Sequence, residues 1–391
     1  CPINTPIPQV IQLYKNGEIE KAGEILFNNN PLSVICAIVC PHEKQCRGNC
    51  IRGIKKEPVH FQSIEQEIST EYLKNTKFIK PESNGIKVAV IGSGPAGLTV
   101  AFELAKKGYD VTIFEKNEKI GGVLTYGIPD FRLNKEFLEE IINMLKELGV
   151  NFETEKELGE NIHIKELKEK FDCVFLGIGA ESPSKYDLGN FEQIYDSEYF
   201  LKAYNRNNFI PNLGNVVIIG GGNVAMDSAR AALKMGAKTS NILYRRDTEH
   251  MPARKIELEE AIQDGVNPVF TTRVIKANGK DGKIENVECI KTQVIDGKAI
   301  DMPNTEFEFK ADSVVFAIGL KPNKEVLEKE GLAYNERGLI DIDEKGKTNI
   351  EGVYAGGDLS ETKSTVCRAL GSAKKAANSI MEILEKGDKN V

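Results

Sequence analysis

The sequence predicts an α/β protein with two parallel-sheet domains of the Rossmann type, preceded by a helical segment rich in cysteine. A short β-branched strand, a glycine-rich turn and a helix follow one another at 86–107 and again from Val216 onward. Strand–helix alternation of this kind is typical of parallel sheets whose faces are covered by helices. Five of the eight cysteines lie in the first fifty residues, where strand patterns are nearly absent.

The composition is that of a globular protein of two or three domains: 391 residues, 41% hydrophobic and 28% charged. A net charge of −7 argues against nucleic acid as the main partner, since phosphate binding needs a basic excess. No apolar run approaches the roughly 20 residues of a membrane helix, so we expect no membrane partner. Cysteines in a long chain without an export signal favour metal or catalytic use, and hence a cytoplasmic setting.

The elements can be assigned in chain order from hydrophobic periodicity. The first 80 residues contain helical patterns at Ile7–Tyr14 and Ile19–Phe27. Residues 266–310 alternate β-branched and polar residues, which predicts hairpins with turns at Asn278–Gly279 and Asp296–Gly297. The other expected strands are Ile86–Ile91, Asp110–Glu115, Cys173–Gly177, Val216–Ile219, Val314–Ile318 and Val353–Ala355, and the other expected helices are Ala96–Lys107, Asn134–Leu148 and Ser372–Leu384.

The first glycine-rich turn has the dinucleotide-binding fingerprint, Gly92-Ser93-Gly94-Pro95-Ala96-Gly97. Its glycines permit a tight turn, close approach of a pyrophosphate and close packing of helix on strand. The pyrophosphate then lies at a helix N-terminus, where free N–H groups favour anions. Glu115, with Lys116 after it, ends the next strand, and an acid there is placed to accept a hydrogen bond from a ribose hydroxyl.

The second glycine-rich turn, Gly220-Gly221-Gly222-Asn223-Val224-Ala225, ends in alanine, an accepted variant. Arg245 and Arg246 stand where the first unit has Glu115. Two guanidinium groups suit the 2′-phosphate of NADPH better than the bare ribose of NADH. We therefore expect FAD at the first turn and NADPH at the second.

Longer motifs are more specific than either fingerprint: Gly121–Leu133 (GGVLTYGIPDFRL), Gly220–Asp227 (GGGNVAMD), Tyr244–Arg246, Tyr354–Asp358 (YAGGD) and Ser364–Ala376. With these motifs the chain resembles the small (β) subunit of NADPH-dependent glutamate synthase over nearly its whole length. Its relatives include the large subunit of the NADH-dependent ferredoxin:NADP oxidoreductase and the N-terminal half of dihydropyrimidine dehydrogenase. The resemblance implies two Rossmann-like domains of the two-dinucleotide flavoprotein type after a helical iron–sulfur domain. The segments would be 1–80 (iron–sulfur), 81–207 and 319–391 (FAD), and 208–318 (NADPH).

The resemblance also implies roles at the flavin. The flavin side of FAD would be contacted by Gly122, Leu124, Arg132 and Leu133. Asp358, after Gly357, would hydrogen-bond the ribityl chain, and the turn at Thr365 and Val366 would approach the pyrimidine edge of the ring. From the residues alone, Asp358 is equally well explained as a turn-capping residue.

Four cysteines, Cys36, Cys40, Cys46 and Cys50, fall within fifteen residues. Their spacing suits iron–sulfur ligation and zinc about equally. The resemblance implies a 4Fe–4S cluster held by Cys1, Cys40, Cys46 and a Glu or Gln on the following helix, for which we choose Glu65 over Gln66. Cys50 would be the last ligand of a second cluster, and Cys36 would be a packing residue. The other three ligands of that second cluster lie upstream in relatives, so we expect a truncated chain with one cluster at most.

The implied activity is oxidation of NADPH through FAD and an iron–sulfur cluster. The acceptor would be a partner chain, the large catalytic (α) subunit of glutamate synthase or an analogous subunit. The cofactors supply the chemistry, so no side chain is named as catalytic acid or base. Two alternatives are a subunit of a bifurcating ferredoxin:NADP oxidoreductase and a stand-alone sulfur or sulfide oxidoreductase. A disulfide reductase is disfavoured because Cys173, Cys289 and Cys367 are isolated from one another.

Overall fold

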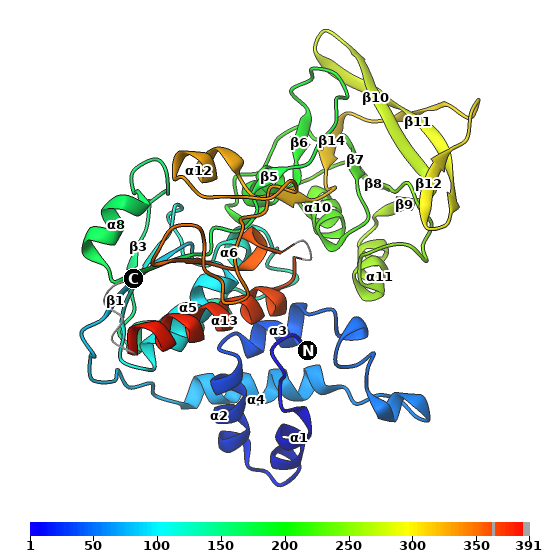
Figure 1. The fold of residues 1–391 in the computed structure, drawn as a ribbon. Coiled ribbons are helices and arrows are strands. Elements are labelled where there is room, and N and C mark those ends of the chain that lie inside the picture. Colours follow the sequence, from blue (N-terminus) through cyan, green and yellow to red (C-terminus); the bar gives the residue numbers. More distant parts are fainter. Residues whose placement is uncertain (362–363, 386–391) are drawn as a thin grey trace. The chain divides into compact units, whose positions relative to one another are not determined.

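The computed structural model describes residues 1–361 and 364–385, which form two compact units (Figure 1). The first unit contains Cys1–Thr125, Asp130–Ala180 and the chain from Lys321 onward, and the second contains Tyr126–Pro129 and Glu181–Leu320. The division after residue 180 differs from the expected boundary at 207. Within 181–207, one strand pairs with the sheet of the second unit and one helix packs in its hydrophobic core. Residues 362–363 and 386–391 of the expected segment 319–391 lie outside the described residues.

The N-terminal segment of the first unit is helical, as its patterns predict. Leu26, Phe61 and Ile68 are buried at the centre of this helical cluster, where the apolar faces of three helices meet. The helices are α1 (Ile7–Lys15), α2 (Ile19–Asn29), α3 (Ser33–Val39) and α4 (Phe61–Asn75), with short 3-10 helices η1 (His42–Lys44) and η2 (Ile51–Ile54).

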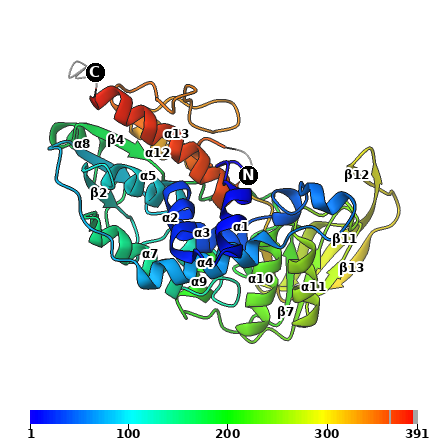
Figure 2. The same cartoon turned by 90° about the horizontal axis from the view of Figure 1, so that it is seen from below.

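The rest of the first unit is built on a five-stranded parallel sheet in the order β16-β4-β1-β2-β3. Its strands are β1 (Lys87–Ile91), β2 (Asp110–Phe114), β3 (Asn151–Glu153), β4 (Cys173–Leu176) and β16 (Val353–Ala355). Helices α5 and α13 pack side by side (Figure 2). Besides η3 (Gly357–Leu359), the helices are α5 (Pro95–Ala105), α6 (Val123–Tyr126), α7 (Glu136–Glu147), α8 (Ile164–Lys170), α12 (Lys324–Lys329) and α13 (Val366–Glu385).

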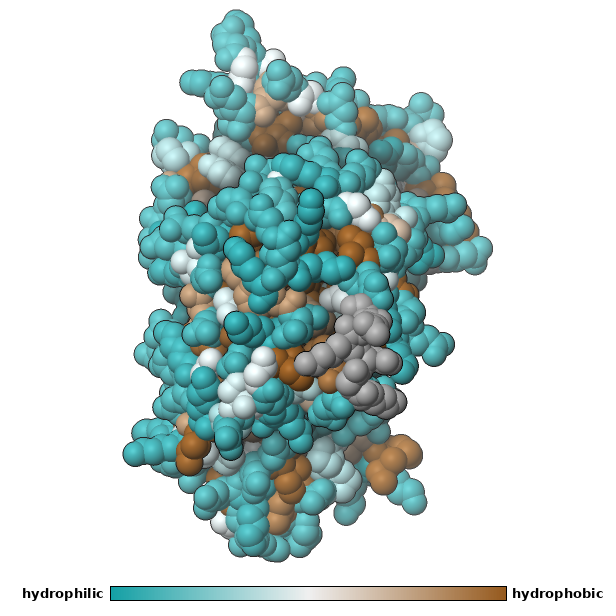
Figure 3. Space-filling view, turned by 60° about the vertical axis from the view of Figure 1, so that its left-hand side comes forward, coloured by the Kyte–Doolittle hydropathy of each residue, from teal (hydrophilic) through white to brown (hydrophobic). Residues whose placement is uncertain are grey.

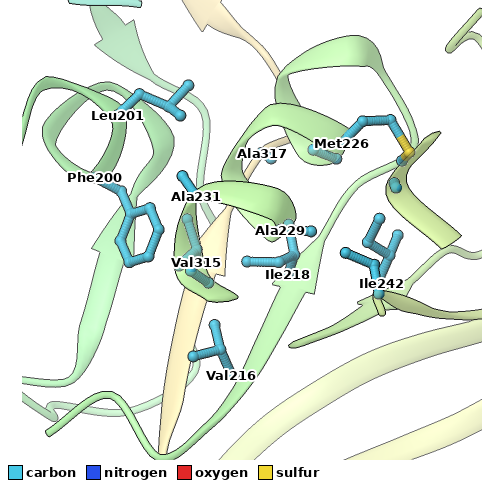
Figure 4. Close-up of a cluster of buried hydrophobic side chains, with 14 of the residues drawn as sticks. Phe200, Leu201, Val216, Ile218, Met226, Ala229, Ala231, Ile242, Val315 and Ala317 are labelled. Carbon is cyan, nitrogen blue, oxygen red and sulfur yellow. The ribbon is translucent and has the colours of Figure 1, made fainter. Parts of the chain in front are cut away.

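The second unit repeats this plan with a parallel sheet in the order β6-β14-β7-β8-β9. Its core is apolar, with Val216 and Ile218 of β7, Val315 of β14 and Ile242 of β8 beside alanines of helix α10 (Figure 4). The strands are β6 (Ile194–Asp196), β7 (Asn215–Ile219), β8 (Thr239–Leu243), β9 (Asn267–Val269) and β14 (Ser313–Phe316), and the helices are α9 (Ser197–Asn205), α10 (Asn223–Lys234) and α11 (Lys255–Gln263).

An antiparallel sheet also belongs to the second unit, and the predicted position of one of its two hairpin turns is wrong. The turn at Asp296–Gly297 is present, but the first hairpin turns at Asp281–Gly282, where both residues have positive φ. Asn278 and Gly279 lie in a strand at a register shift. The strands are β10 (Thr272–Lys280), β11 (Lys283–Ile295), β12 (Lys298–Asp301) and β13 (Phe307–Lys310), while β5 (Ser182–Pro183) and β15 (Leu320–Lys321) form a two-stranded ribbon.

The closing helix begins earlier than its pattern predicts. The expected start is Ser372, whereas α13 begins at Val366, which is itself one of the two residues expected to approach the flavin. The face shown in Figure 3 is mostly hydrophilic, with apolar residues in small groups. Within the described residues, no single helix has the length and apolar composition to span a membrane; taken together, the sharply bent pair α2 and α3 meets that test.

Candidate functional site

The glycines of the first fingerprint have the geometry that a dinucleotide turn requires. Gly92 has φ +94°, and a Cβ there would lie 2.5 Å from the carbonyl oxygen of Gly177. A Cβ on Gly97 would overlap the carbonyl of Gly92, so the helix could not pack this closely on the strand. Gly94, by contrast, faces open space at the N-terminus of α5, which has no side-chain cap. The turn therefore fits a pyrophosphate, because free N–H groups and room for an anion coincide there.

Glu115 lies beneath this turn and is 3% exposed. One carboxylate oxygen accepts from the backbone N–H and the hydroxyl of Ser93, at 3.1 and 2.5 Å. The other accepts from the backbone and side-chain amides of Asn117, at 2.9 and 2.8 Å. The Ser93 hydroxyl in turn accepts from the backbone N–H of Gly121, the first residue of the GGVLTYGIP motif. Glu115 thus links both motifs, and its contact with a ribose stays a prediction.

The YAGGD segment lies against the start of α5. Gly357 has φ +73°, and a Cβ there would lie 3.0 Å from the Cβ of Ala96. Its N–H donates to the hydroxyl of Ser372 over 2.8 Å, which fixes η3 on α13. Asp358 follows, and burial raises its pKa to about 6, with Glu361 adding to the rise and a hydrogen bond from Ser364 opposing it. The fingerprint, Asp358 and the first turn of α13 therefore meet within one unit, as a flavin site requires.

Four of the remaining expected flavin residues lie on the GGVLTYGIP segment and its continuation: Gly122, Leu124, Arg132 and Leu133. Gly122 has φ +53°, and a Cβ there would lie 3.0 Å from the Cα of Gly94, so this segment passes close to the pyrophosphate turn. Leu124 and Leu133 are fully buried, whereas Lys116, Arg132, Thr365 and Val366 are half-buried. Their contacts with a flavin stay predictions.

The second fingerprint has the same design. Gly220 has φ +152°, and Gly222 faces open space at the uncapped N-terminus of α10. Ala225 is fully buried, while Val224 is 42% exposed beside the turn. Asn223 accepts from the backbone N–H of Arg254 through its Oδ1 at 2.9 Å, which ties the turn to the start of α11.

Arg245 and Arg246 follow β8, as expected. The Arg245 side chain is exposed, and its carbonyl accepts from the hydroxyl of Thr292 over 2.7 Å. The Arg246 guanidinium stacks 5.6 Å from the ring centre of Tyr244 and donates from Nη1 to the carbonyl of Gly297 at 3.5 Å. Its buried Nε has no hydrogen-bond partner among the described residues. A guanidinium N–H without a partner and an exposed neighbouring arginine fit a 2′-phosphate.

The N-terminal helices enclose a cavity lined by four predicted cluster ligands, Cys1, Cys40, Cys46 and Glu65. Cys50 is not among its lining residues, and its place at a different cluster stays a prediction. No three described His, Cys, Asp or Glu side chains are arranged to hold a single metal ion. A 4Fe–4S cluster does not need such convergence, because each ligand binds a different iron. The donor set, three thiols and one carboxyl, therefore fits a cluster better than a single ion.

Glu65 rather than Gln66 faces the cavity. Glu65 is 5% exposed and lines it, whereas Gln66 is half-buried and is not a lining residue. Burial raises the pKa of Glu65 to about 8, and the hydroxyl of Ser33 donates to its Oε1 over 3.0 Å. The charged form of a carboxyl buried this deeply needs a neighbouring cation to stabilise it, and iron would be such a cation.

Three further residues line this cavity although no sequence motif indicates it. Cys367, in the first turn of α13, is 1% exposed, and its Sγ accepts from Gln45 Nε2 at 3.0 Å. A hydrogen bond with Cys40 is the main cause that lowers the pKa of Cys367, to about 6. Asn30, at the end of α2, also lines the cavity. Cys367 and Gln45 are 322 positions apart, so only the folded chain shows that they belong to one site.

Two family descriptions together match nearly the whole chain. Residues 86–381 match the pyridine nucleotide-disulphide oxidoreductases, and residues 1–77 match the dihydropyrimidine dehydrogenase domain II, 4Fe–4S cluster. The second match decides between the two metal centres that the cysteine spacing left open, and it confirms iron–sulfur over zinc. FAD, NADPH and a 4Fe–4S cluster are thus the cofactors of this fold combination.

Curated relatives cover almost all of the chain. It is 31% identical over 416 residues to the glutamate synthase (NADPH) small chain of Escherichia coli (strain K12), spanning 98% of this chain and 88% of that protein. It is also 31% identical over 431 residues to the NADPH-Fe(3+) oxidoreductase subunit beta of Geobacter sulfurreducens, spanning 99% of this chain. The chain covers 63% of that subunit, and about three fifths of other curated relatives.

Among solved structures, Mycobacterium tuberculosis FprA in complex with NADPH has a similar fold. The TM-score is 0.67 at 19% identity, over 78% of this chain and 86% of that one. The predicted fold class is thereby confirmed. The chain is an oxidoreductase of the pyridine nucleotide-disulphide oxidoreductase family, with an N-terminal 4Fe–4S domain, and it belongs to the family of glutamate synthase small chains.

Proposed function

We propose that this chain oxidises NADPH and delivers the electrons, through FAD and one 4Fe–4S cluster, to a larger partner subunit that makes glutamate from glutamine and 2-oxoglutarate. The observation that supports this most directly is the cavity of Cys1, Cys40, Cys46 and Glu65, which lies in the same unit as the FAD fingerprint. The relatives named as small chains and beta subunits support a partner of larger size.

The chain's own residues bind and orient the cofactors. The N-termini of α5 and α10 accept the two pyrophosphates, with Gly94 and Gly222 leaving room for them. Arg245 and Arg246 select the phosphorylated nucleotide. When bound, FAD would supply hydride acceptance and one-electron release, and the cluster would supply one-electron transfer.

The cavity also has a physical link to the flavin segment. Thr365 and Val366 are the expected flavin contacts, and Cys367 follows them directly on α13. Thr365 Oγ1 and Cys367 Sγ lie 3.5 Å apart. Cys367 also contacts Gln45, which belongs to the segment 40–50 that carries Cys40, Cys46 and Cys50 and is called the cysteine loop. A chain segment that reaches from the flavin edge to the cysteine cavity favours electron exit on this side of the unit.

The test uses the whole chain, reconstituted anaerobically with FAD, iron and sulfide. NADPH should bleach the flavin absorbance and produce the electron paramagnetic resonance signal of a reduced cluster. With a glutamate synthase large subunit encoded beside this chain, glutamate should form from glutamine and 2-oxoglutarate. No flavin absorbance after reconstitution would contradict the core of the proposal. Reduction of ferredoxin, without glutamate formation, would favour a ferredoxin:NADP oxidoreductase subunit instead.

A further inference from the structure

Asn30 is the C-cap residue directly after helix α2 and is 1% exposed. Its backbone N–H donates to the carbonyl of Leu26 at 2.7 Å, and its own carbonyl accepts from the N–H of Ser33 at 3.1 Å. Its side-chain Oδ1 accepts from the N–H of Leu32 at 2.9 Å. Three of its four polar groups are therefore held in place by the last turn of α2 and by the turn between α2 and α3.

The fourth group, the side-chain amide nitrogen Nδ2, is buried and has no hydrogen-bond partner among the described residues. The amide cannot simply be reversed, because its NH₂ would then face the N–H of Leu32. Leaving a buried donor without an acceptor costs free energy, so such groups are rare in folded proteins and call for an explanation.

Asn30 lines the cavity of Cys1, Cys40, Cys46 and Glu65. Two acceptors in its wall already have donors: Glu65 Oε1 accepts from Ser33, and Cys367 Sγ accepts from Gln45. The missing acceptor should therefore come with whatever fills the cavity. Thiolate and sulfide sulfurs are anionic acceptors, and a hydrogen bond to an anionic group is stronger than a neutral one.

We infer that Asn30 donates a hydrogen bond from Nδ2 to a sulfur atom of the cluster, either a sulfide or a ligating thiolate, and thereby raises its reduction potential. Reduction adds negative charge to the cluster, so a donor at its sulfurs stabilises the reduced form more than the oxidised form. Asn30 is then a tuning residue and not a ligand. This inference rests on the cluster assignment in the proposed function.

The experiment measures the midpoint potential of the cluster in the reconstituted whole chain by redox titration followed with electron paramagnetic resonance. Asn30→Asp keeps an oxygen for the N–H of Leu32 but replaces the donor by an acceptor, and Asn30→Ala removes both. We expect both variants to lower the potential, with roughly a tenfold change in the ratio of oxidised to reduced cluster, equal to about 59 mV for one electron. Asn28→Ala changes an exposed asparagine two positions away and should leave the potential unchanged.

A second measurement does not depend on whether the variants fold. In the wild-type chain labelled with 15N-asparagine, pulsed electron paramagnetic resonance of the reduced cluster should show coupling of its electron spin to one asparagine nitrogen. Unchanged potentials in both Asn30 variants, or no such coupling, would overturn the inference. A wild-type chain that binds no iron or labile sulfide would instead overturn the cluster assignment itself.

Discussion

Gln45 donates a hydrogen bond from Nε2 to the Sγ of Cys367 over 3.0 Å, and so joins the cysteine loop to the first turn of α13. The two residues come from opposite ends of the chain, yet both line the cluster cavity. Their contact fixes the cysteine loop relative to the segment at Thr365 and Val366.

Replacing Gln45 by alanine should therefore loosen the cysteine loop. We expect Gln45→Ala to lower the free energy of unfolding of the cofactor-free protein by about 1 kcal/mol, the usual net value of one intramolecular hydrogen bond. Denaturant unfolding measures this, with Gln9→Ala on the exposed face of α1 as the matched control. Equal stability of the two variants would show that the Gln45 contact adds nothing.

The choice of Glu65 over Gln66 can be tested by cluster content. Glu65→Ala removes an oxygen ligand and should lower bound iron and labile sulfide per flavin several-fold, whereas Gln66→Ala should retain them. Glu65→Gln should keep most of the cluster, because an amide oxygen can still reach the iron. Iron loss in Gln66→Ala, with full content in Glu65→Ala, would reverse the assignment. Melting of the cofactor-free variants separates lost ligation from lost folding.

The parts of the site that depend on local backbone geometry could be predicted from sequence. Gly92 and Gly97 are needed because a Cβ at either would meet nearby backbone, and this requirement recurs in every turn of this shape. The sheets follow from short β-branched runs that are buried on both faces.

The parts that depend on long-range packing could not be predicted. Asn278–Gly279 and Asp281–Gly282 are both good turn dipeptides, and inward-facing Val274, Ile284 and Val287 select the second. The start of α13 at Val366 differs from the prediction because Thr365 and Val366 are β-branched, and packing on α5 overrides their low helix propensity. Asn30 and Cys367 join the site only through tertiary contacts.

The arginine pair predicts which nucleotide the second unit prefers. Arg245→Ala and Arg246→Ala should each raise the dissociation constant of NADPH roughly tenfold or more, since a hydrogen bond to a charged group contributes about 1.5–3 kcal/mol. Binding of NADH should change little, because it lacks the 2′-phosphate. Fluorescence titration with both nucleotides measures this, and Lys280→Ala, an exposed cation on β10, is the control. Equal losses for NADH and NADPH would refute the 2′-phosphate role.

Asp358 predicts a pH dependence of stability. Burial raises its pKa from 3.8 to about 6 in the folded chain, so between these values the folded state binds the proton more tightly than the unfolded state. The free energy of unfolding therefore falls as pH rises through this window and stays low above it. Asp358→Asn cannot titrate, so it should be more stable than the wild type by about 1–3 kcal/mol at neutral pH, with a smaller advantage near pH 4–5.

Urea unfolding of the flavin-free protein at several pH values measures this difference, with the exposed Glu336→Gln as the control. The same Asp358→Asn variant should bind FAD several-fold more weakly, because a neutral amide makes a weaker hydrogen bond to a hydroxyl than a carboxylate does. A carboxylate that destabilises the free protein and strengthens flavin binding is one retained for its ligand. A stability difference that does not vary with pH, or unchanged FAD affinity, would instead support the turn-capping role of Asp358.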